Sequence, residues 1–229
     1  MTASTAPAAT LDGIGLLAPL EPAERKMLAA RCAWRRYRAG ERILSRDSSC
    51  RHVLFIVEGA VRVVNYAASG REVAYARIGA GHHVGELSAI DGEPRSASVE
   101  AETDCLVASL PASAFHELLL AHGAITLALL RDLARMVRRA DERITELTVL
   151  GAMQRVYREL QRLARPSPEG LKVTPLPTQE SLAAHVGTTR ETVARAFGQL
   201  IRSGIVGRSG RDLVIRNAAM LDTLIGAEA

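Results

Sequence analysis

Apolar and polar residues alternate with a short period over the first half of this 229-residue chain. From residue 38 to residue 110, short apolar runs are separated by glycine-containing breaks, which predicts a series of short β-strands. The breaks stand at Gly40, at Glu58 and Gly59, at Ser69 and Gly70, and from Gly79 to Gly81. Many short strands with turns at this spacing are typical of a sandwich or barrel. A short helix is expected ahead of them, over residues 22–31, and Pro111 is expected to end the β region.

The period then changes to that of a helix. From residue 112 to about residue 165 the apolar residues recur at helical spacing, and a break at Gly151 is expected to separate a long helix from the next one. The long helix carries the 3-4 alternation of a coiled-coil seam at Leu127, Leu130, Ala134, Val137, Ile144 and Thr148, interrupted by Asp141. Pairing with a second copy of the chain is favoured over packing on its own β domain alone, because the seam persists for about three heptads.

Residues 177–206, PTQESLAAHVGTTRETVARAFGQLIRSGIV, predict two helices joined by a short turn. The first helix is expected over about residues 178–185, with Gly187 as its stop. In the second helix, Thr188 and Glu191 match a capping box, which is a strong signal for a helix start. Helix, short glycine turn and helix is the layout of the helix-turn-helix motif.

The second helix of this motif divides into an apolar and a polar face. The apolar face is expected to be buried and consists of Val193, Phe197, Leu200 and Ile201. The opposite face, near the start of the helix, holds Arg190, Glu191, Ala194 and Arg195. Arginine bonds to O6 and N7 of guanine and glutamate accepts from N4 of cytosine, so this face suits the recognition of base edges in DNA.

A β-hairpin wing is predicted after the second helix, with Ser209 and Gly210 at its tip. Contacts to the DNA backbone are expected from the residues that flank the tip and from the first helix and the turn, namely Arg208, Arg211, Gln179, Thr188 and Thr189. The alternative is a structural helical hairpin in which Arg190, Glu191 and Arg195 are only solvated or pair with each other, as Glu191 and Arg195 can at i,i+4.

The net charge of +4 is unevenly distributed and supports a polyanionic partner. Residues 1–150 hold 18 basic and 18 acidic side chains, whereas residues 151–229 hold 11 basic and 7 acidic ones. The whole excess of positive charge therefore lies in the part of the chain that carries the helix-turn-helix pattern. A basic module of this kind is expected to bind double-stranded DNA.

Several classes of protein are disfavoured by what the sequence lacks. Its three cysteines lie far apart, which argues against a disulfide framework, a zinc knuckle or an iron–sulfur cluster. No apolar stretch approaches the length of a membrane helix, and the first residues do not form a signal peptide, so the cytoplasm is expected and no membrane partner. No nucleophile–base pair stands out, so no enzyme is expected, and no metal site or cofactor.

The segment GELSAIDGEPRSASV, residues 85–99, holds one isolated acid and one isolated base in a glycine-containing loop. A cyclic phosphate carries one negative charge, which a guanidinium and backbone N–H groups hold well. Arg95 together with the amide and hydroxyl of Ser96 would supply these groups. The carboxylate of Glu86 would accept from a ribose 2′-hydroxyl, and Gly85 would let the backbone approach the ligand closely.

Both segments resemble parts of one family. VGTTRETVAR after a β sandwich and a long helix, and GEL followed seven residues later by PRSA, resemble the cyclic AMP receptor protein and fumarate–nitrate regulator (Crp/Fnr) family of transcription regulators. The resemblance implies an α+β fold with a cyclic-nucleotide-binding β-roll (a double-stranded β-helix), a dimerisation helix and a winged helix-turn-helix. The domains would be a flexible tail at residues 1–15, the β-roll at 16–122, the dimerisation helix at 123–150 and the DNA-binding domain at 151–229.

The resemblance also implies function and site residues. It implies a homodimer that responds to a cyclic nucleotide, binds a palindromic site with TGTGA-like halves and contacts RNA polymerase. The nucleotide would be bound by Gly85, Glu86, Leu87, Arg95, Ser96 and Ala97. Ala140 and Asp141 stand where the cyclic AMP receptor protein has the Thr and Ser that bond adenine. An ionised Asp141 accepts hydrogen bonds only, from an adenine amino group or from the N1–H and N2–H₂ edge of guanine, so cAMP and cGMP both remain open as effectors.

Three alternatives compete with this interpretation. In the first, Glu86 and Arg95 pair with each other, and the β-roll binds a different effector or none and serves as a dimerisation scaffold. The second is a cupin-like metalloenzyme built on His82, His83 and Glu86, which is disfavoured because the histidines are adjacent in sequence. The third is a haem sensor with Cys105 or His83 as the axial ligand, for which both residues are weak candidates.

Overall fold

The computed structural model describes residues 10–66, 72–168 and 170–226. It divides into two compact units, Met1–Met136 and Val137–Ala229, which meet within one helix. Residues 1–9 of the expected tail and the expected turn at Ser69 and Gly70 lie outside the described residues. Leu11 and Ile14, also assigned to the tail, are buried in the core of the first unit, so the chain is already packed from Leu11 onward.

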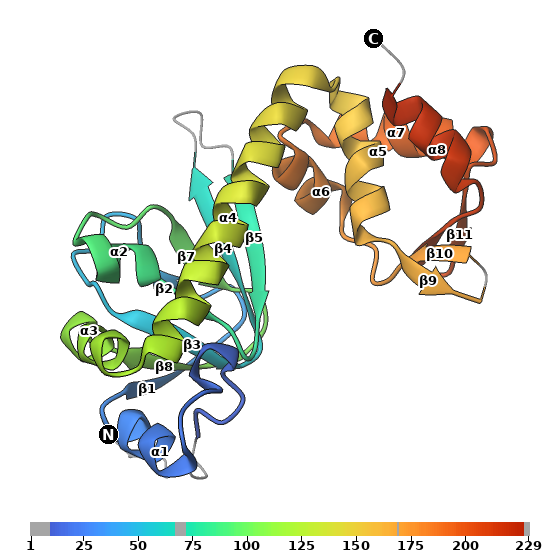
Figure 1. Cartoon of the computed structure of the whole chain (residues 1–229). Coiled ribbons are helices and arrows are strands. Elements are labelled where there is room, and N and C mark those ends of the chain that lie inside the picture. The colour runs from blue at the N-terminus through green and yellow to red at the C-terminus, as the bar shows by residue number, and fades with distance from the viewer. Residues whose placement is uncertain (1–9, 67–71, 169, 227–229) are drawn as a thin grey trace. The chain divides into compact units, whose positions relative to one another are not determined.

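Two four-stranded antiparallel sheets form the first unit (Figure 1). One sheet has the order β1 (Ala33–Tyr37), β8 (Cys105–Leu110), β3 (Val53–Glu58) and β6 (His83–Val84). The other has the order β2 (Arg42–Leu44), β7 (Ser98–Ala101), β4 (Ala60–Tyr66) and β5 (Glu72–Gly79). The expected turns at Gly40, Gly59 and Gly81 fall between strands, and all three glycines have a positive φ. The β-roll and the α+β class are therefore confirmed.

Helices cover one side of this β-roll. A 3₁₀ turn (Gly15–Leu17), α1 (Pro22–Ala30) and α3 (Ala112–Ala121) contribute to a shared apolar core with β3 and β8, in which Phe55 and Phe115 are fully buried. The short helix α2 (Glu86–Asp91) lies between β6 and β7. The short helix expected over residues 22–31 is confirmed, and Pro111 separates β8 from α3 as expected.

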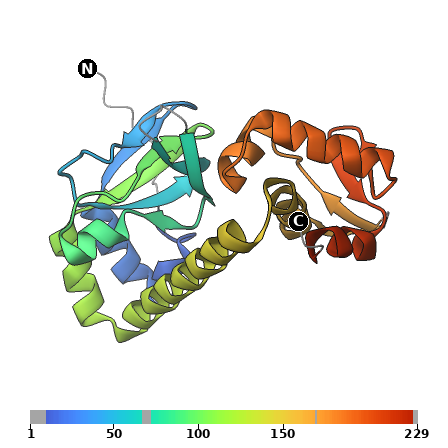
Figure 2. The same cartoon turned by 90° about the horizontal axis from the view of Figure 1, so that it is seen from above.

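The long helix α4 spans Gly123–Val149 and is uninterrupted in both views (Figures 1 and 2). Its start is anchored in the first core by Ile125 and Leu129, which are buried. Beyond them the expected seam is exposed, with Leu130 at 55% and Ile144 at 63% exposure. No single described helix is long and apolar enough to cross a membrane, although α3 and α4, bent by 112°, pass that test as a pair by length and composition.

The second unit is a helical core backed by a small sheet. After the expected break at Gly151 it contains α5 (Ala152–Leu163), α6 (Gln179–Val186), α7 (Arg190–Arg202) and α8 (Ala218–Gly226). Its sheet has the order β11 (Val206–Ser209), β12 (Asp212–Ile215), β10 (Gly170–Val173) and β9 (Arg165–Ser167). The helix-turn-helix and the wing formed by β11 and β12 are confirmed.

The expected apolar face of α7 is correct except at its end. Val193, Phe197 and Leu200 are buried, but Ile201 is 40% exposed. Each residue of an α-helix is rotated by about 100° from the one before, so the residue after the inward-facing Leu200 points away from the core. The helix ends one residue later, at Arg202, so Ile201 lies at its exposed end.

Candidate nucleotide and DNA sites

The loop between β6 and β7 brings Gly85 and Arg95 into direct contact. Gly85 has φ +86°, in the left-handed region that favours glycine. A Cβ atom at this position would lie 2.6 Å from Nη1 of Arg95 and 3.0 Å from the carbonyl oxygen of His52. The absence of a side chain at Gly85 therefore lets the guanidinium lie against the backbone at the start of α2.

Arg95 is buried, with 4% exposure, and neutral groups hold it in place. Its Nη1 donates to the carbonyl of Gly85 and its Nη2 to the carbonyl of His52, each at 2.8 Å, while its Nε has no hydrogen-bond partner in the described structure. No carboxylate oxygen of a described residue lies within 4.0 Å of the guanidinium. A buried charge is costly unless it is paired, so the site is suited to an anion.

Glu86 is also buried and is the first residue of α2. It does not pair with Arg95, so the self-paired form of the empty-loop alternative is wrong. Its carboxylate makes no hydrogen bond to any described residue, which leaves it able to accept from a ligand hydroxyl. Burial lowers the pKa of His83, and the charge of Glu86 opposes this shift.

The remaining expected nucleotide-binding residues differ in position. Ser96 is exposed at the loop surface next to Arg95, Leu87 is half-buried on α2, and Ala97 is buried before β7. Ala140 and Asp141 are exposed on α4 and belong to the second unit, so their part in binding the base stays a prediction.

The start of α7 differs from the expected capping box by one residue. Thr189 is the N-cap, and its Oγ1 accepts from the amide of Thr192 at 3.3 Å. Thr188 belongs to the turn, since its amide donates to the carbonyl of Ala183 at 3.0 Å and so completes the end of α6. The expected cap at Thr188 is therefore wrong: Thr188 still belongs to the end of α6 after the left-handed Gly187, and Thr189 is the residue that caps α7.

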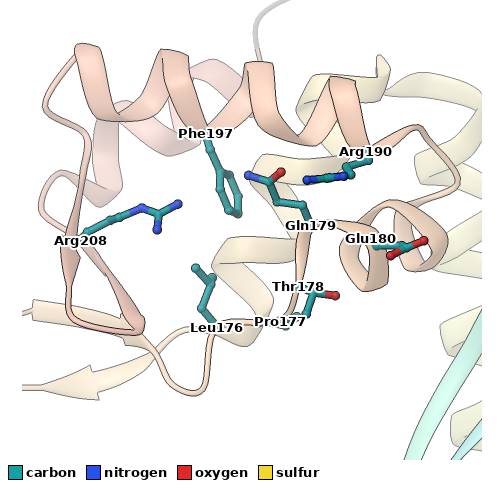
Figure 3. A pocket seen from close by; sticks show the side chains of 8 residues that line it. All are labelled: Leu176, Pro177, Thr178, Gln179, Glu180, Arg190, Phe197 and Arg208. Carbon is teal, nitrogen blue, oxygen red and sulfur yellow. The ribbon is translucent and has the colours of Figure 1, made fainter. Parts of the chain in front are cut away.

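A groove of about 560 Å³ lies between α7, the start of α6 and the wing (Figure 3). The side chains of Gln179, Arg190 and Arg208, all expected DNA-binding residues, converge there from three different elements. Leu176 and Phe197 form its apolar floor. Two guanidiniums and an amide around one groove can hold phosphate oxygens or the acceptors of base edges.

The polar face of α7 is exposed as expected. Arg190, Glu191 and Arg195 all face solvent, as does Arg211 at the tip of the wing. Within the described chain, neither Arg190 nor Arg195 has a carboxylate oxygen within 4.0 Å, so the i,i+4 pair of the helical-hairpin alternative is not formed. The pKa of Glu191 is lowered by hydrogen bonds to its own amide and to Thr189, with smaller contributions from Arg190 and Arg195.

Two contributors to these sites carried no signal in the sequence. His52 supplies a backbone carbonyl to Arg95 from 43 residues away, and any residue type has such a carbonyl. Leu176 lines the DNA-side groove from the loop before α6 and shows no pattern that separates it from an ordinary core residue.

Comparison with known proteins places both sites in recognised domains. Residues 34–122 match the model of the cyclic nucleotide-binding domain, and residues 154–224 match the model of the Crp-like helix-turn-helix domain. The cAMP-activated global transcriptional regulator Vfr of Pseudomonas aeruginosa is 29% identical over 197 residues, covering 82% of this chain and 91% of Vfr.

A second relative and a solved structure agree. The CRP-like cAMP-activated global transcriptional regulator of Mycobacterium tuberculosis is 32% identical over 170 residues, covering 72% of this chain and 76% of that protein. The structure of FixK2 from Bradyrhizobium japonicum is 28% identical, covers 86% of this chain and 99% of that one, and superposes with a TM-score of 0.70. The chain therefore belongs to the Crp/Fnr family of DNA-binding transcription regulators and carries a cyclic nucleotide-binding domain.

Proposed function

We propose that this regulator binds a cyclic purine nucleotide at Arg95 and, in response, binds a palindromic DNA site as a homodimer. The observation that carries the proposal is the buried guanidinium of Arg95, which lacks a counter-charge in the described structure. It would bind the cyclic phosphate together with the amide and hydroxyl of Ser96. Glu86 would accept from the ribose 2′-hydroxyl, while Gly85, Leu87 and Ala97 would shape the wall of the site.

The effector we favour is cAMP. Both regulators compared above are named as cAMP-activated, and one is 32% identical to this chain. The base would contact Asp141 of α4, whose carboxylate accepts hydrogen bonds from the adenine amino group. The same carboxylate accepts from the guanine edge, so cGMP is the competitor against which selectivity is measured. Ala140 would contribute van der Waals contact only.

The homodimer would form along α4. Leu127, Leu130, Val137 and Ile144 of the seam are each about half exposed or more, although they repeat at coiled-coil spacing. Pairing two copies would remove this apolar surface from water. We propose that the β-roll ends at residue 122, that residues 123–150 are the dimerisation helix and that residues 151–229 are the DNA-binding domain.

In the dimer, each α7 would enter one major groove. Arg190 and Arg195 would donate to guanine and Glu191 would accept from cytosine in TGTGA-like halves, with Gln179, Thr188, Thr189, Arg208 and Arg211 on phosphates. A two-fold dimer reads half-sites about 34 Å apart, one DNA turn. Nucleotide binding would shift the population toward the dimer with this spacing. RNA polymerase would be the further partner, and the cytoplasm the place of action.

The test is calorimetric titration of the full chain with cAMP and, separately, with cGMP, followed by anisotropy of a labelled TGTGA palindrome with and without nucleotide. Micromolar binding and an operator affinity raised by the nucleotide are expected. Absence of heat from both nucleotides, with folded protein that still binds the duplex, would contradict the proposal. That outcome would favour the alternative of a β-roll that senses another effector or serves only as a scaffold.

A further inference from the structure

Arginines from two other helices bind the carbonyls at the C-terminal end of α6. Arg143 of α4 donates through Nη2 to the carbonyl of His185. Arg155 of α5 donates through Nε to the carbonyl of Val186 at 3.0 Å and through Nη2 to that of Gly187 at 3.3 Å. The last carbonyls of a helix have no partner within the helix, and here they are satisfied from outside it.

The same region contains a ring of ion pairs and hydrogen bonds. Glu146 of α4 lies 2.7 Å from Nη2 of Arg162 and 3.7 Å from Nη1 of Arg143. Glu159 of α5 lies 3.3 Å from Nη1 of Arg162 and 3.4 Å from Nε2 of His185. Since Arg143 also donates to the carbonyl of His185, the five residues form a ring that joins α4, α5 and α6.

The two carboxylates of this ring are largely shielded from water. The side chains of Glu146 and Glu159 are 13% and 6% exposed, so their pairs with Arg162 and Arg143 are weakly screened. Burial lowers the pKa of Arg143, and the charges of Glu146 and Glu159 oppose that shift. Groups held by several partners at once are fixed more firmly than a single pair, and removing Arg143 takes one partner from Glu146 and the donor from the carbonyl of His185.

Arg155 extends the ring to the junction between α4 and α5. Its Nη1 donates to the carbonyl of Leu150 at 2.8 Å, at the end of α4. One guanidinium therefore joins the end of α4 to Gly187 in the turn of the helix-turn-helix. Only Thr188 and Thr189 separate Gly187 from Arg190, the first residue of α7. The end of α4 is thus linked to the start of α7 through one side chain and two residues of the turn.

We propose that Arg143 and Arg155 are positioning residues for DNA recognition, which fix the turn before α7 to the end of α4. The orientation of α7 then follows the conformation of α4, and the two arginines transmit the effect of the nucleotide to the DNA-binding surface. The transmission rests on the proposed function, in which α4 responds to the nucleotide. The attachment of the turn to α4 does not depend on it.

The test uses full-length Arg143→Gln and Arg155→Gln variants, with Arg131→Gln as a matched control. Arg131 is an exposed arginine of α4, and none of its contacts joins the ring or α6. Hydrogen exchange across residues 183–192 reports the attachment of the turn without nucleotide. Anisotropy with a duplex that holds two inverted TGTGA halves about one turn apart, with and without saturating cAMP, reports the transmission.

In the wild type we expect cAMP to raise operator affinity at least about fivefold, the lower end of ordinary allosteric coupling. In both glutamine variants this factor should fall to about one, and exchange across the turn should accelerate at least about tenfold, while Arg131→Gln matches the wild type. Coupling is reciprocal, so the operator's effect on cAMP affinity should disappear with it. Arg143→Lys keeps the charge and a donor nitrogen and should restore part of the coupling.

Two results would overturn the proposal. Glutamine variants with wild-type exchange across the turn would show that the arginines do not hold it. Accelerated exchange with an unchanged cAMP factor would show that the attachment transmits nothing. A wild type that binds the duplex without any effect of cAMP contradicts the proposed function instead, and the exchange measurement still decides whether the arginines position the turn. If Arg143→Gln does not fold, Arg155→Gln answers the same questions.

Discussion

Replacing Arg95 with methionine should separate ligand binding from stability. The guanidinium has five N–H donors, of which one bonds to Gly85 and one to His52, so three remain, including Nε. Two of these would bond a cyclic phosphate as charge-assisted pairs, each contributing about 1.5–3 kcal/mol. The loss of both corresponds to roughly 3–6 kcal/mol, and therefore to at least about 100-fold weaker cAMP binding.

The free protein should respond differently to Arg95→Met. Methionine leaves the two carbonyls of Gly85 and His52 without their donor, which costs about 1–3 kcal/mol for each buried acceptor. It also removes a buried guanidinium that has no counter-charge in the described structure, and the penalty for such an ion is several kcal/mol. These contributions oppose each other and are similar in size. The free energy of unfolding without ligand should therefore change by less than about 2 kcal/mol.

Thermal unfolding with and without cAMP tests both statements. At a concentration 100 times the wild-type Kd, cAMP stabilises the wild type by about 2.7 kcal/mol, which raises Tm by about 5–11 °C for a chain of this size. A 100-fold weaker variant gains only about 0.4 kcal/mol, or about 1–2 °C. Arg38→Met, which removes an exposed arginine of the same unit, should behave as wild type. Calorimetric binding of cAMP to Arg95→Met within tenfold of the wild-type Kd would refute the reasoning.

Four further changes test other parts of the structure. Gly85→Ala places a Cβ 2.6 Å from Nη1 of Arg95, so calorimetry should show cAMP binding weakened at least about tenfold. Arg211→Gln should weaken binding to all duplexes equally and reduce the magnitude of the slope of log affinity against log salt concentration by about 1. Ile144→Glu should lower the mass found by light scattering from twice 24.6 kDa to that value, because it charges the exposed seam. Burial lowers the pKa of His83, so the imidazolium is disfavoured in the folded state and stability is lost as pH falls below 6.5. His83→Gln should therefore make Tm depend less on pH between about pH 7 and pH 5.

Local patterns account for what the sequence could predict. The strands around Gly40 and Gly59, the helices of the helix-turn-helix and the wing each lie within a short window whose period or turn residues mark them. By contrast, no local pattern in the sequence marks β9, β10 or α8. Strands of three or four residues such as β9 and β10 are too short to show a period, and β10 pairs with β12, whose residues lie 40 to 44 positions later in the chain.

The same limit explains the errors within the sites. Two consecutive threonines offered two caps for α7, and the choice between them depended on which N–H the end of α6 uses. That is a contact between helices rather than a property of either one. The sequence shows no signal for the five-residue ring for a related reason, since its members come from three helices between residues 143 and 185 and each looks like an ordinary surface group.

An arginine without a carboxylate partner indicates an anion-binding site only when its guanidinium is buried. Arg190 has none within the described chain, but water solvates its exposed guanidinium at little cost, so its role depends on the groove it shares with Gln179 and Arg208. Arg162 has two carboxylate partners in the chain and needs no ligand to complete it. Arg95 is buried and has only neutral carbonyls as partners, a state that folding alone does not favour. An anion that reaches its Nε removes that penalty, and for this reason the nucleotide site has a stronger physical basis than the assignment of any single base contact.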